Sequence, residues 1–133
     1  MKPLLLATLL PISALAAGLT EEQEFYVLWS TETRGRWNAP DGDLDKPGGP
    51  SIGPFQIQRA YWRDSGVAGD WQDCRDLEYA KKVVRAYWKR YGARGIEDRF
   101  RLHNGGPSRR GTDQYWKKAR EIMRNEFGDE REK

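Results

Sequence analysis

Apolar residues recur every three or four positions along three stretches of the chain, and this spacing predicts amphipathic helices. The first stretch begins with a Thr-Glu-Glu-Gln capping box at residues 20–23 and predicts a helix over residues 21–33. The clearest pattern covers residues 76–91, where lysine and arginine occupy the opposite face. The last pattern predicts a helix that begins at residue 112 or 113 and ends near residue 127.

The remaining segments are shorter and rich in turn-forming residues. Residues 38–50 are dominated by glycine, proline and aspartate and predict a loop or short hairpin, while residues 51–57 suit a short strand or bend. Short helices are expected around Tyr61 and over residues 96–102, and residues 103–107, HNGGP, predict a sharp turn. The fold class expected is therefore mainly α (α+β), a single helical domain with a small β-hairpin or loop insert.

The first residues differ in kind from the rest of the chain. Lys2 precedes a short leucine-rich run, and Ala14-Leu15-Ala16 forms an A-x-A cleavage sequence. The apolar run is shorter than the ~20 residues that span a bilayer, so we expect a signal peptide over residues 1–16. The domain would then comprise residues 17–133, with a frayed tail from about residue 128. This predicts a secreted protein, extracellular or periplasmic, with no membrane contact after cleavage.

Composition narrows the possible functions. The 23 lysines and arginines exceed the 20 aspartates and glutamates only slightly, and the two signs are interspersed, so nucleic-acid binding is not expected. A single cysteine, Cys74, excludes an intrachain disulfide framework, and with one histidine the chain offers no cysteine- or histidine-based metal cage. We therefore expect no metal and no cofactor, and a packed rather than reactive Cys74.

Carboxyl groups are the first candidates for chemistry. Glu32 continues the apolar face of the first predicted helix near its C-terminal end, where burial and the helix dipole both disfavour a charged carboxylate. Asp43 and Asp45 lie in the polar loop, where at least one should stay ionised. Two carboxyls in such different environments are typical of glycosidic-bond cleavage. From spacing alone, the favoured interpretation is a solvated helix-end glutamate with ordinary turn aspartates.

Other candidates leave alternatives open. Trp37, Trp62 and Trp71 fall in or beside loops, so they either stack on sugar rings or close a small core. His103 is either a general base or a hydrogen-bonded turn residue. A nucleophile and base pair of Cys74 with His103 is disfavoured, because no activating motif surrounds the cysteine.

Several motifs together resemble those of the invertebrate-type, destabilase-like lysozymes. Their order and spacing match this family across nearly the whole mature chain, and GPFQI with a following YW, together with HNGGP, is a specific combination. The motifs are TETRG at 31–35, SIGPFQI and AYWRD within 51–64, VRAYWKRY at 84–91, HNGGP at 103–107 and YW at 115–116.

The resemblance implies a lysozyme-like fold and cleavage of the β-1,4 bond between N-acetylmuramic acid and N-acetylglucosamine in peptidoglycan. It implies that Glu32 is the general acid. The second carboxylate, a nucleophile or stabiliser, aligns with either Asp43 or Asp45, and we choose Asp43 because it keeps a Gly-Asp pair.

The same resemblance places further residues in the cleft. Gln56, His103 and Asn104 fall on motif positions that look like cleft walls or their supports, and we expect them to contact substrate. The expected partner is bacterial cell-wall peptidoglycan, and the protein is expected to be a monomer.

One departure from the family is large. Its members are usually rich in disulfides, whereas this chain has Cys74 alone, so packing must replace the stabilisation of several bridges. The alternative function is a catalytically inactive, lysozyme-like protein that binds glycans. An isopeptidase activity, reported for some relatives, lacks a convincing nucleophile here. The sequence leaves hydrolysis and anhydro-forming lytic cleavage undistinguished.

Overall fold

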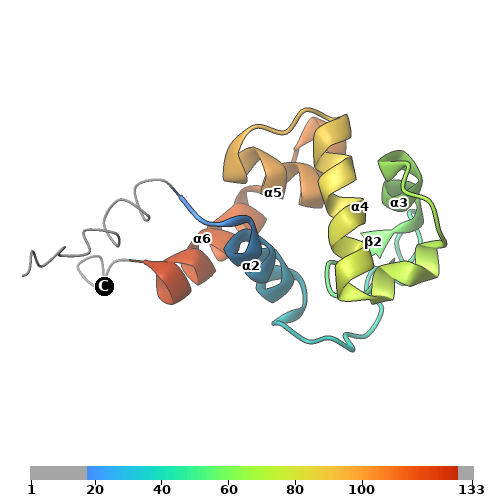
Figure 1. Ribbon diagram of the computed structural model, residues 1–133, viewed down its shortest axis with the longest axis horizontal. Coiled ribbons are helices and arrows are strands. Elements are labelled where there is room, and N and C mark those ends of the chain that lie inside the picture. Colours follow the sequence, from blue (N-terminus) through green and yellow to red (C-terminus); the bar gives the residue numbers. More distant parts are fainter. Residues whose placement is uncertain (1–17, 129–133) are drawn as a thin grey trace, which may run out of the picture.

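The computed structural model describes residues 18–128 as five α-helices, two short 3₁₀-helices and a two-stranded sheet (Figure 1). The expected signal peptide lies outside the described residues. No helix within residues 18–128 is long and apolar enough to cross a membrane. In chain order the elements are α2 (Glu21–Thr33), β1 (Ser51–Ile52), β2 (Ile57–Gln58), α3 (Arg59–Ser65), η1 (Trp71–Arg75), α4 (Leu77–Arg90), α5 (Gly95–Gly105), η2 (Gly106–Ser108) and α6 (Asp113–Phe127).

The three long helices begin where the sequence predicts. At the start of α2 the Thr20 hydroxyl accepts from the Gln23 amide at 3.1 Å, and the Gln23 side chain accepts from the Thr20 amide at 3.0 Å. This reciprocal capping box fixes the first turn of the helix. The side chain of Asp76 caps α4 in the same position, accepting from the Tyr79 amide at 2.9 Å. The mainly helical fold class is therefore confirmed, with α2 ending as expected at Thr33.

The sharp turn predicted over residues 103–107 is wrong. Helix α5 continues through His103 and Asn104 to Gly105, and η2 follows directly. Gly105 stays helical because it permits close packing: a Cβ there would lie 2.5 Å from Cγ2 of Thr112. The chain leaves the helix only at Gly106, which has a φ of 71°. As a result His103 lies on a buried helical face rather than in an exposed turn.

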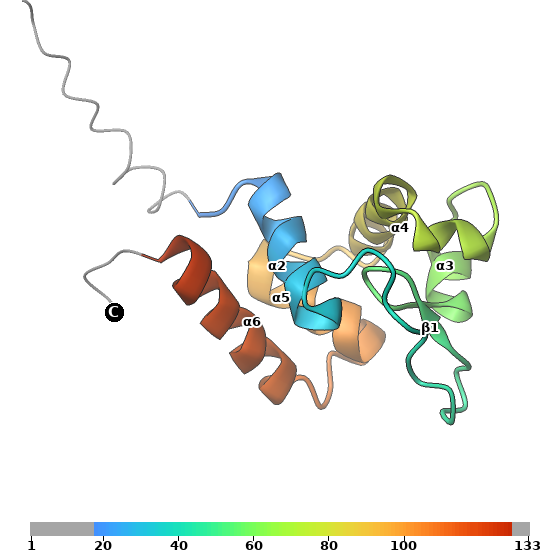
Figure 2. The same ribbon diagram turned by 90° about the horizontal axis from the view of Figure 1, so that it is seen from below.

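The insert between α2 and α3 forms a small antiparallel hairpin, in which Ser51 pairs with Gln58 and Ile52 with Ile57. An isolated bridge joins Gly42 to Ser51, so the preceding loop runs alongside β1. In Figure 2 this loop and hairpin lie at the end of the domain away from the start of α2 and the end of α6. The loop therefore carries Asp43 beside the sheet, where the Ser51 hydroxyl reaches it, whereas Asp45 is exposed.

Aromatic packing forms the core between the helices. Phe25 of α2 stacks on Trp88 of α4 with ring centroids 5.4 Å apart, and Phe55 of the hairpin packs 5.6 Å from Phe25. Figures 1 and 2 both show α6 running beside α2, which it contacts directly. Cys74 is fully buried in this core, and burial raises the pKa of its thiol to about 12. The expectation that Cys74 is packed in the core is confirmed.

Gly53, in the tight turn between β1 and β2, lies against the backbone of η1. Its φ is 74°, and a Cβ at this position would lie 2.0 Å from the carbonyl oxygen of Cys74. Real Cβ atoms do not approach a carbonyl oxygen so closely. Glycine is required here both for the backbone conformation and for the contact that seats the hairpin on the core.

We predict that Gly53→Ala lowers the free energy of unfolding by at least about 3 kcal/mol, or roughly 10 °C in Tm. Gly66→Ala is the matched control, because Gly66 has a similar φ of 69° and a Cβ added there would meet no atom within 4 Å. The control should lose only about 1 kcal/mol from backbone strain. Thermal unfolding by circular dichroism measures both. Equal losses in the two variants would contradict the close approach.

Candidate active site

A cavity of about 550 Å³ lies between the C-terminal end of α2, the hairpin and its loop, α5 and α6. All five site residues expected from the sequence line it: Glu32, Asp43, Gln56, His103 and Asn104. The other lining residues are Thr31, Gly42, Lys46, Ser51, Gln58, Tyr61, Tyr115 and Lys118. The fold thus brings together residues from motifs that lie far apart along the chain.

Glu32 projects into this cavity from the last turn of α2. Its side chain is 16% exposed, and its Oε1 accepts a hydrogen bond of 2.7 Å from the hydroxyl of Tyr115 on α6. Nε2 of His103 lies 3.4 Å from the same oxygen. A carboxyl that is largely withdrawn from water and faces a cavity is placed where a proton can be held and delivered.

His103 is held by two further contacts that define its tautomer. Nε2 lies 2.9 Å from the carbonyl oxygen of Phe55, which can only accept, so Nε2 carries a hydrogen. Nδ1 lies 2.8 Å from the hydroxyl of Tyr61. Burial raises the pKa of Tyr61 well above 10, so its hydroxyl keeps its proton and can donate it to Nδ1. His103 therefore links α5 to the hairpin and to α3. Both of its ring nitrogens have other partners, and Cys74 forms no hydrogen bond with it, as expected from the sequence.

Asp43 faces the cavity from the loop and is held in the charged form. The Ser51 hydroxyl donates to its Oδ2 at 2.5 Å, and Lys46 forms an ion pair with Oδ1 at 3.0 Å. These two contacts, the serine bond first, lower the pKa of Asp43 below its usual value. Asp45 is exposed and does not line the cavity. Of the two aspartates left open by the sequence, Asp43 is the one that shares the cavity with Glu32.

Gln56 and Asn104 occupy different parts of the wall. The Gln56 amide donates to the carbonyl oxygens of Gly53 at 3.0 Å and Pro40 at 3.4 Å, linking the hairpin turn to the loop. A Cβ on Gly42 would lie 2.4 Å from Oε1 of Gln56, so the loop packs directly on this side chain. Gln56 thus supports the loop that carries Asp43, whereas Asn104 is an exposed part of the rim.

Four residues that the sequence did not identify as site residues help to build this cavity. Tyr61, Tyr115, Ser51 and Lys118 all line it, and the first three bond directly to His103, Glu32 and Asp43 respectively. Tyr61, Ser51 and Tyr115 lie inside the motifs that carry the family resemblance, which is the one signal that could have marked them. Their aromatic and helical spacing indicates core packing equally well.

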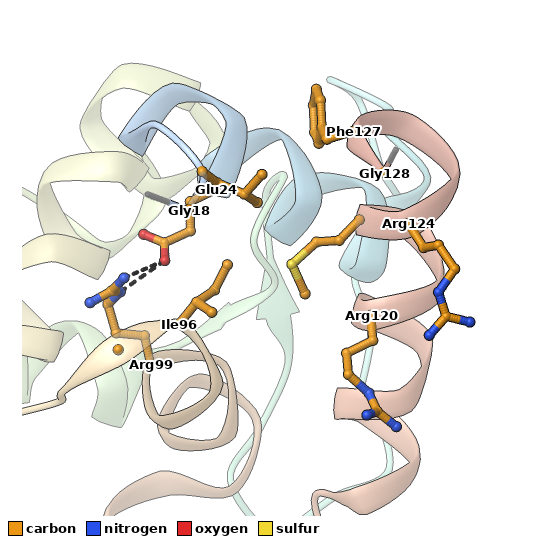
Figure 3. A pocket seen from close by; sticks show the side chains of 11 residues that line it. Gly18, Glu24, Ile96, Arg99, Arg120, Arg124, Phe127 and Gly128 are labelled. Atoms are coloured by element: carbon orange, nitrogen blue, oxygen red, sulfur yellow. Dashed lines mark hydrogen bonds and ion pairs between the residues drawn. The ribbon is translucent and has the colours of Figure 1, made fainter. Parts of the chain in front are cut away.

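A second hollow, of about 520 Å³, lies between the first turns of α2 and α5 and the end of α6 (Figure 3). Figure 3 shows Glu24 and Arg99 pointing toward one another there, joined by an ion pair of 2.5 Å. The floor is apolar, with Ile96 and Phe127 among its residues. Glu24 is the one carboxylate among the residues that line this hollow, and it is paired with Arg99. The hollow therefore lacks the two carboxyl groups in different surroundings that Glu32 and Asp43 provide in the first cavity.

The loop tryptophans do not line the Glu32 cavity. Trp71 is buried and donates to the carbonyl oxygen of Ile57 at 2.9 Å, and Trp62 donates to the hydroxyl of Tyr79 at 2.9 Å. Both side chains therefore help to close the core, which is the second of the two roles that the sequence allowed. Trp37 alone of the three is highly exposed, at 76%.

The Asp43 contacts predict a pH-dependent contribution to stability. A carboxyl whose pKa is lowered by folding stabilises the protein above its unfolded pKa of about 4 and loses this effect as the pH falls through the lowered value. Ser51→Ala should therefore reduce the free energy of unfolding by about 1 kcal/mol at pH 7, and progressively less below pH 4.

Ser65→Ala is the control for this prediction, because the Ser65 hydroxyl donates to a backbone carbonyl, that of Trp62, at 2.5 Å. Its loss should not vary between pH 7 and pH 3. Urea unfolding across this range measures both variants. A Ser51→Ala loss that stays constant with pH would show that the hydroxyl does not stabilise the charged form of Asp43.

Comparison with known proteins shows that the chain is similar to lysozymes. No family model matches the chain. Lysozyme 1 of Crassostrea virginica is 42% identical over 79 residues, which are 52% of this chain and 43% of that protein. Invertebrate-type lysozyme 6 of Caenorhabditis elegans is 33% identical over 97 residues, covering 58% of this chain and 70% of that protein. The chain therefore spans less than half the length of the Crassostrea virginica protein.

A solved structure shows the same likeness in three dimensions. One chain of the crystal structure of Aeromonas hydrophila PliI in complex with Meretrix lusoria lysozyme superposes with a TM-score of 0.67 and 29% identity. The superposition covers 77% of this chain and 90% of that chain. The resemblance deduced from the motifs is confirmed by the relatives that match in sequence and in fold, and the chain belongs to the invertebrate-type lysozyme family.

Proposed function

We propose that this protein hydrolyses peptidoglycan by cleaving the β-1,4 bond between N-acetylmuramic acid and N-acetylglucosamine. Glu32 is the general acid, and Asp43 is the nucleophile or the stabiliser of the developing positive charge. The observation that carries the proposal is the contrast between the two carboxyls around one cavity. Glu32 is 16% exposed and hydrogen-bonded to a tyrosine, whereas Asp43 is held ionised by Ser51 and Lys46.

The two carboxyls divide the reaction between them. Glu32 transfers its proton to the glycosidic oxygen as the bond to the anomeric carbon breaks, and the bonding electrons leave with that oxygen. Positive charge develops on the sugar ring, and the anionic Asp43 stabilises it or bonds to the anomeric carbon. Water then supplies the hydroxyl of the product and returns a proton to Glu32. At the end of the cycle Glu32 is protonated again and Asp43 is again a free carboxylate, so the enzyme returns to its starting state.

The cavity lining suits a polar polysaccharide. Gln58 and Asn104 offer amide groups for hydroxyl and acetamido substituents, and Lys46 and Lys118 place positive charge at the cavity, which suits the carboxylates of peptidoglycan. The names of the relatives, all lysozymes, support the same substrate class.

We predict that Glu32→Gln lowers the release of reducing ends from purified peptidoglycan by at least about 100-fold, because the amide has no acidic proton to donate. Glu22→Gln is the matched control, since Glu22 lies on the same helix and is exposed. It should retain wild-type activity. Circular dichroism should show that both variants stay folded, because the Tyr115 hydroxyl can donate equally well to the glutamine carbonyl.

Product analysis separates the alternatives to this reaction. Hydrolysis releases reducing ends, whereas lytic cleavage forms anhydro sugars that carry none. Full activity of Glu32→Gln would contradict the assignment of the acid. Binding of the polysaccharide by the wild-type protein with no product of either kind would support the inactive, glycan-binding alternative instead.

The second carboxylate is tested by comparing two neighbouring aspartates. Asp43→Asn should reduce turnover by about 100-fold or more, because a preorganised charge at the anomeric carbon is lost. Asp45→Asn should stay within about 2-fold of wild type, as expected for an exposed surface position outside the cavity. Rates of reducing-end release at saturating substrate measure both. The reverse order of effects would assign the role to Asp45.

A further inference from the structure

The two carboxyl oxygens of Glu32 have different contacts. Oε1 accepts from the Tyr115 hydroxyl at 2.7 Å and lies 3.4 Å from Nε2 of His103. Oε2 takes part in no hydrogen bond with any residue in the described range 18–128. The two oxygens are chemically equivalent in isolation, so this asymmetry is imposed by the fold.

The two groups that face Oε1 both carry a hydrogen, and the Tyr115 hydroxyl donates its hydrogen to this oxygen. Burial and the nearby carboxylate raise the pKa of Tyr115 well above 10, so its hydroxyl keeps its proton and donates. Nε2 of His103 carries a hydrogen that it donates to the Phe55 carbonyl oxygen at 2.9 Å, so this nitrogen has no lone pair with which to accept a proton from Oε1. A protonated oxygen at the Oε1 position would turn its hydrogen toward these donors. The acidic proton of Glu32 therefore belongs on Oε2.

Helix α6 also holds the backbone that carries Glu32. Nζ of Lys118 donates to the carbonyl oxygen of Thr31 at 2.9 Å. Lys118 follows Tyr115 by three positions, so the two side chains lie on the same face of α6. Figure 2 shows α6 running beside α2 along its length. One helix thus fixes both the backbone and the carboxyl group at the end of α2.

We propose that Tyr115 is the positioning residue of the acid: it anchors Oε1 of Glu32, so that the proton is carried and delivered by Oε2. This inference rests on the proposed function. In the reaction the proton leaves Oε2 for the glycosidic oxygen, and negative charge spreads over both carboxyl oxygens. The bond from Tyr115 strengthens as that charge forms, so Tyr115 lowers the barrier without donating its own proton.

The effect on pH dependence has a definite sign. The titratable and charged groups around Glu32 are Tyr61 from α3, His103 from α5, Tyr115 and Lys118 from α6, and Asp43 with Lys46 from the loop. Of these, Tyr115 donates the 2.7 Å bond to the carboxyl group. Removing a donor from a carboxylate makes its charged form less favourable. The alkaline limb of the pH–rate profile should therefore move to higher pH when the hydroxyl is lost.

Tyr115→Phe tests this inference, because it removes the hydroxyl and keeps the ring in place. We expect kcat on peptidoglycan to fall by about 10- to 100-fold, KM to stay within about 2-fold, and the alkaline limb to move to higher pH. Tyr91→Phe is the matched control. It removes a tyrosine–carboxylate bond of the same kind, 2.8 Å to Oδ2 of Asp64, away from the cavity. Its kcat and pH profile should equal those of wild type.

The outcomes distinguish this inference from the function on which it rests. Wild-type kcat and pH profile in Tyr115→Phe, beside an inactive Glu32→Gln, would overturn the positioning role alone. An equal fall in Tyr91→Phe would also overturn it, by showing a general loss of stability. An inactive wild-type protein or an active Glu32→Gln would overturn the proposed function itself. If Tyr115→Phe does not fold, Tyr115→Met removes the same hydroxyl and keeps an apolar side chain on that face of α6. A lower kcat with the alkaline limb moved to higher pH supports the inference there, and a wild-type kcat and pH profile overturn it.

Discussion

The position of Glu32 depends on how α6 packs against the C-terminal end of α2. The hydroxyl of Tyr115 holds the carboxyl group and the ammonium of Lys118 holds the adjacent backbone, across 83 and 87 residues of sequence respectively. With a single cysteine in the chain, no intrachain disulfide can fix this geometry. Noncovalent contacts alone hold the Glu32 side chain in position, and each is worth only about 1–3 kcal/mol. The helix beneath them must therefore be rigidly seated.

That seat is the aromatic core. Phe25 on α2 stacks against Trp88 of α4 and packs on Phe55 of the hairpin, so one side chain joins the helix that carries Glu32 to the hairpin beside the cavity. His103 adds a polar link between the same parts, since it contacts Phe55, Tyr61 and Glu32. The hairpin turn is seated by the close approach of Gly53 to Cys74. In this chain aromatic packing and a buried polar network therefore hold α2, the hairpin and α5 together around the cavity.

Much of the fold follows from local sequence rules. The capping box at Thr20 and Gln23 and the apolar spacing behind it predict α2 with its observed ends, and the same rules predict α4 and α6 within one or two residues. The prediction fails at HNGGP, where glycines normally indicate a turn. There Gly105 serves close packing on Thr112, a contact made only after the chain has folded back on itself. Local pattern cannot reveal that reason.

The site shows the same division, because Tyr115 lies on the apolar stripe of its helix and its spacing predicts core packing. Its hydroxyl acquires a role only when α6 docks beside α2. Likewise, the sequence narrows the partner of Glu32 to two aspartates, and only the folded chain shows that Asp43 shares the cavity.

Catalysis by this site requires that Glu32 and Asp43 act on one sugar chain in one cavity. The most direct measurement is a crystal structure of the folded but inactive Glu32→Gln protein with a bound oligomer of N-acetylglucosamine. We expect the chain to cross the cavity with one glycosidic oxygen within hydrogen-bond distance of residue 32, on the side away from Tyr115, and with the adjoining anomeric carbon facing Asp43. An oligomer seated elsewhere, such as in the hollow beside Glu24 and Arg99, would contradict the assignment of this cavity as the active site.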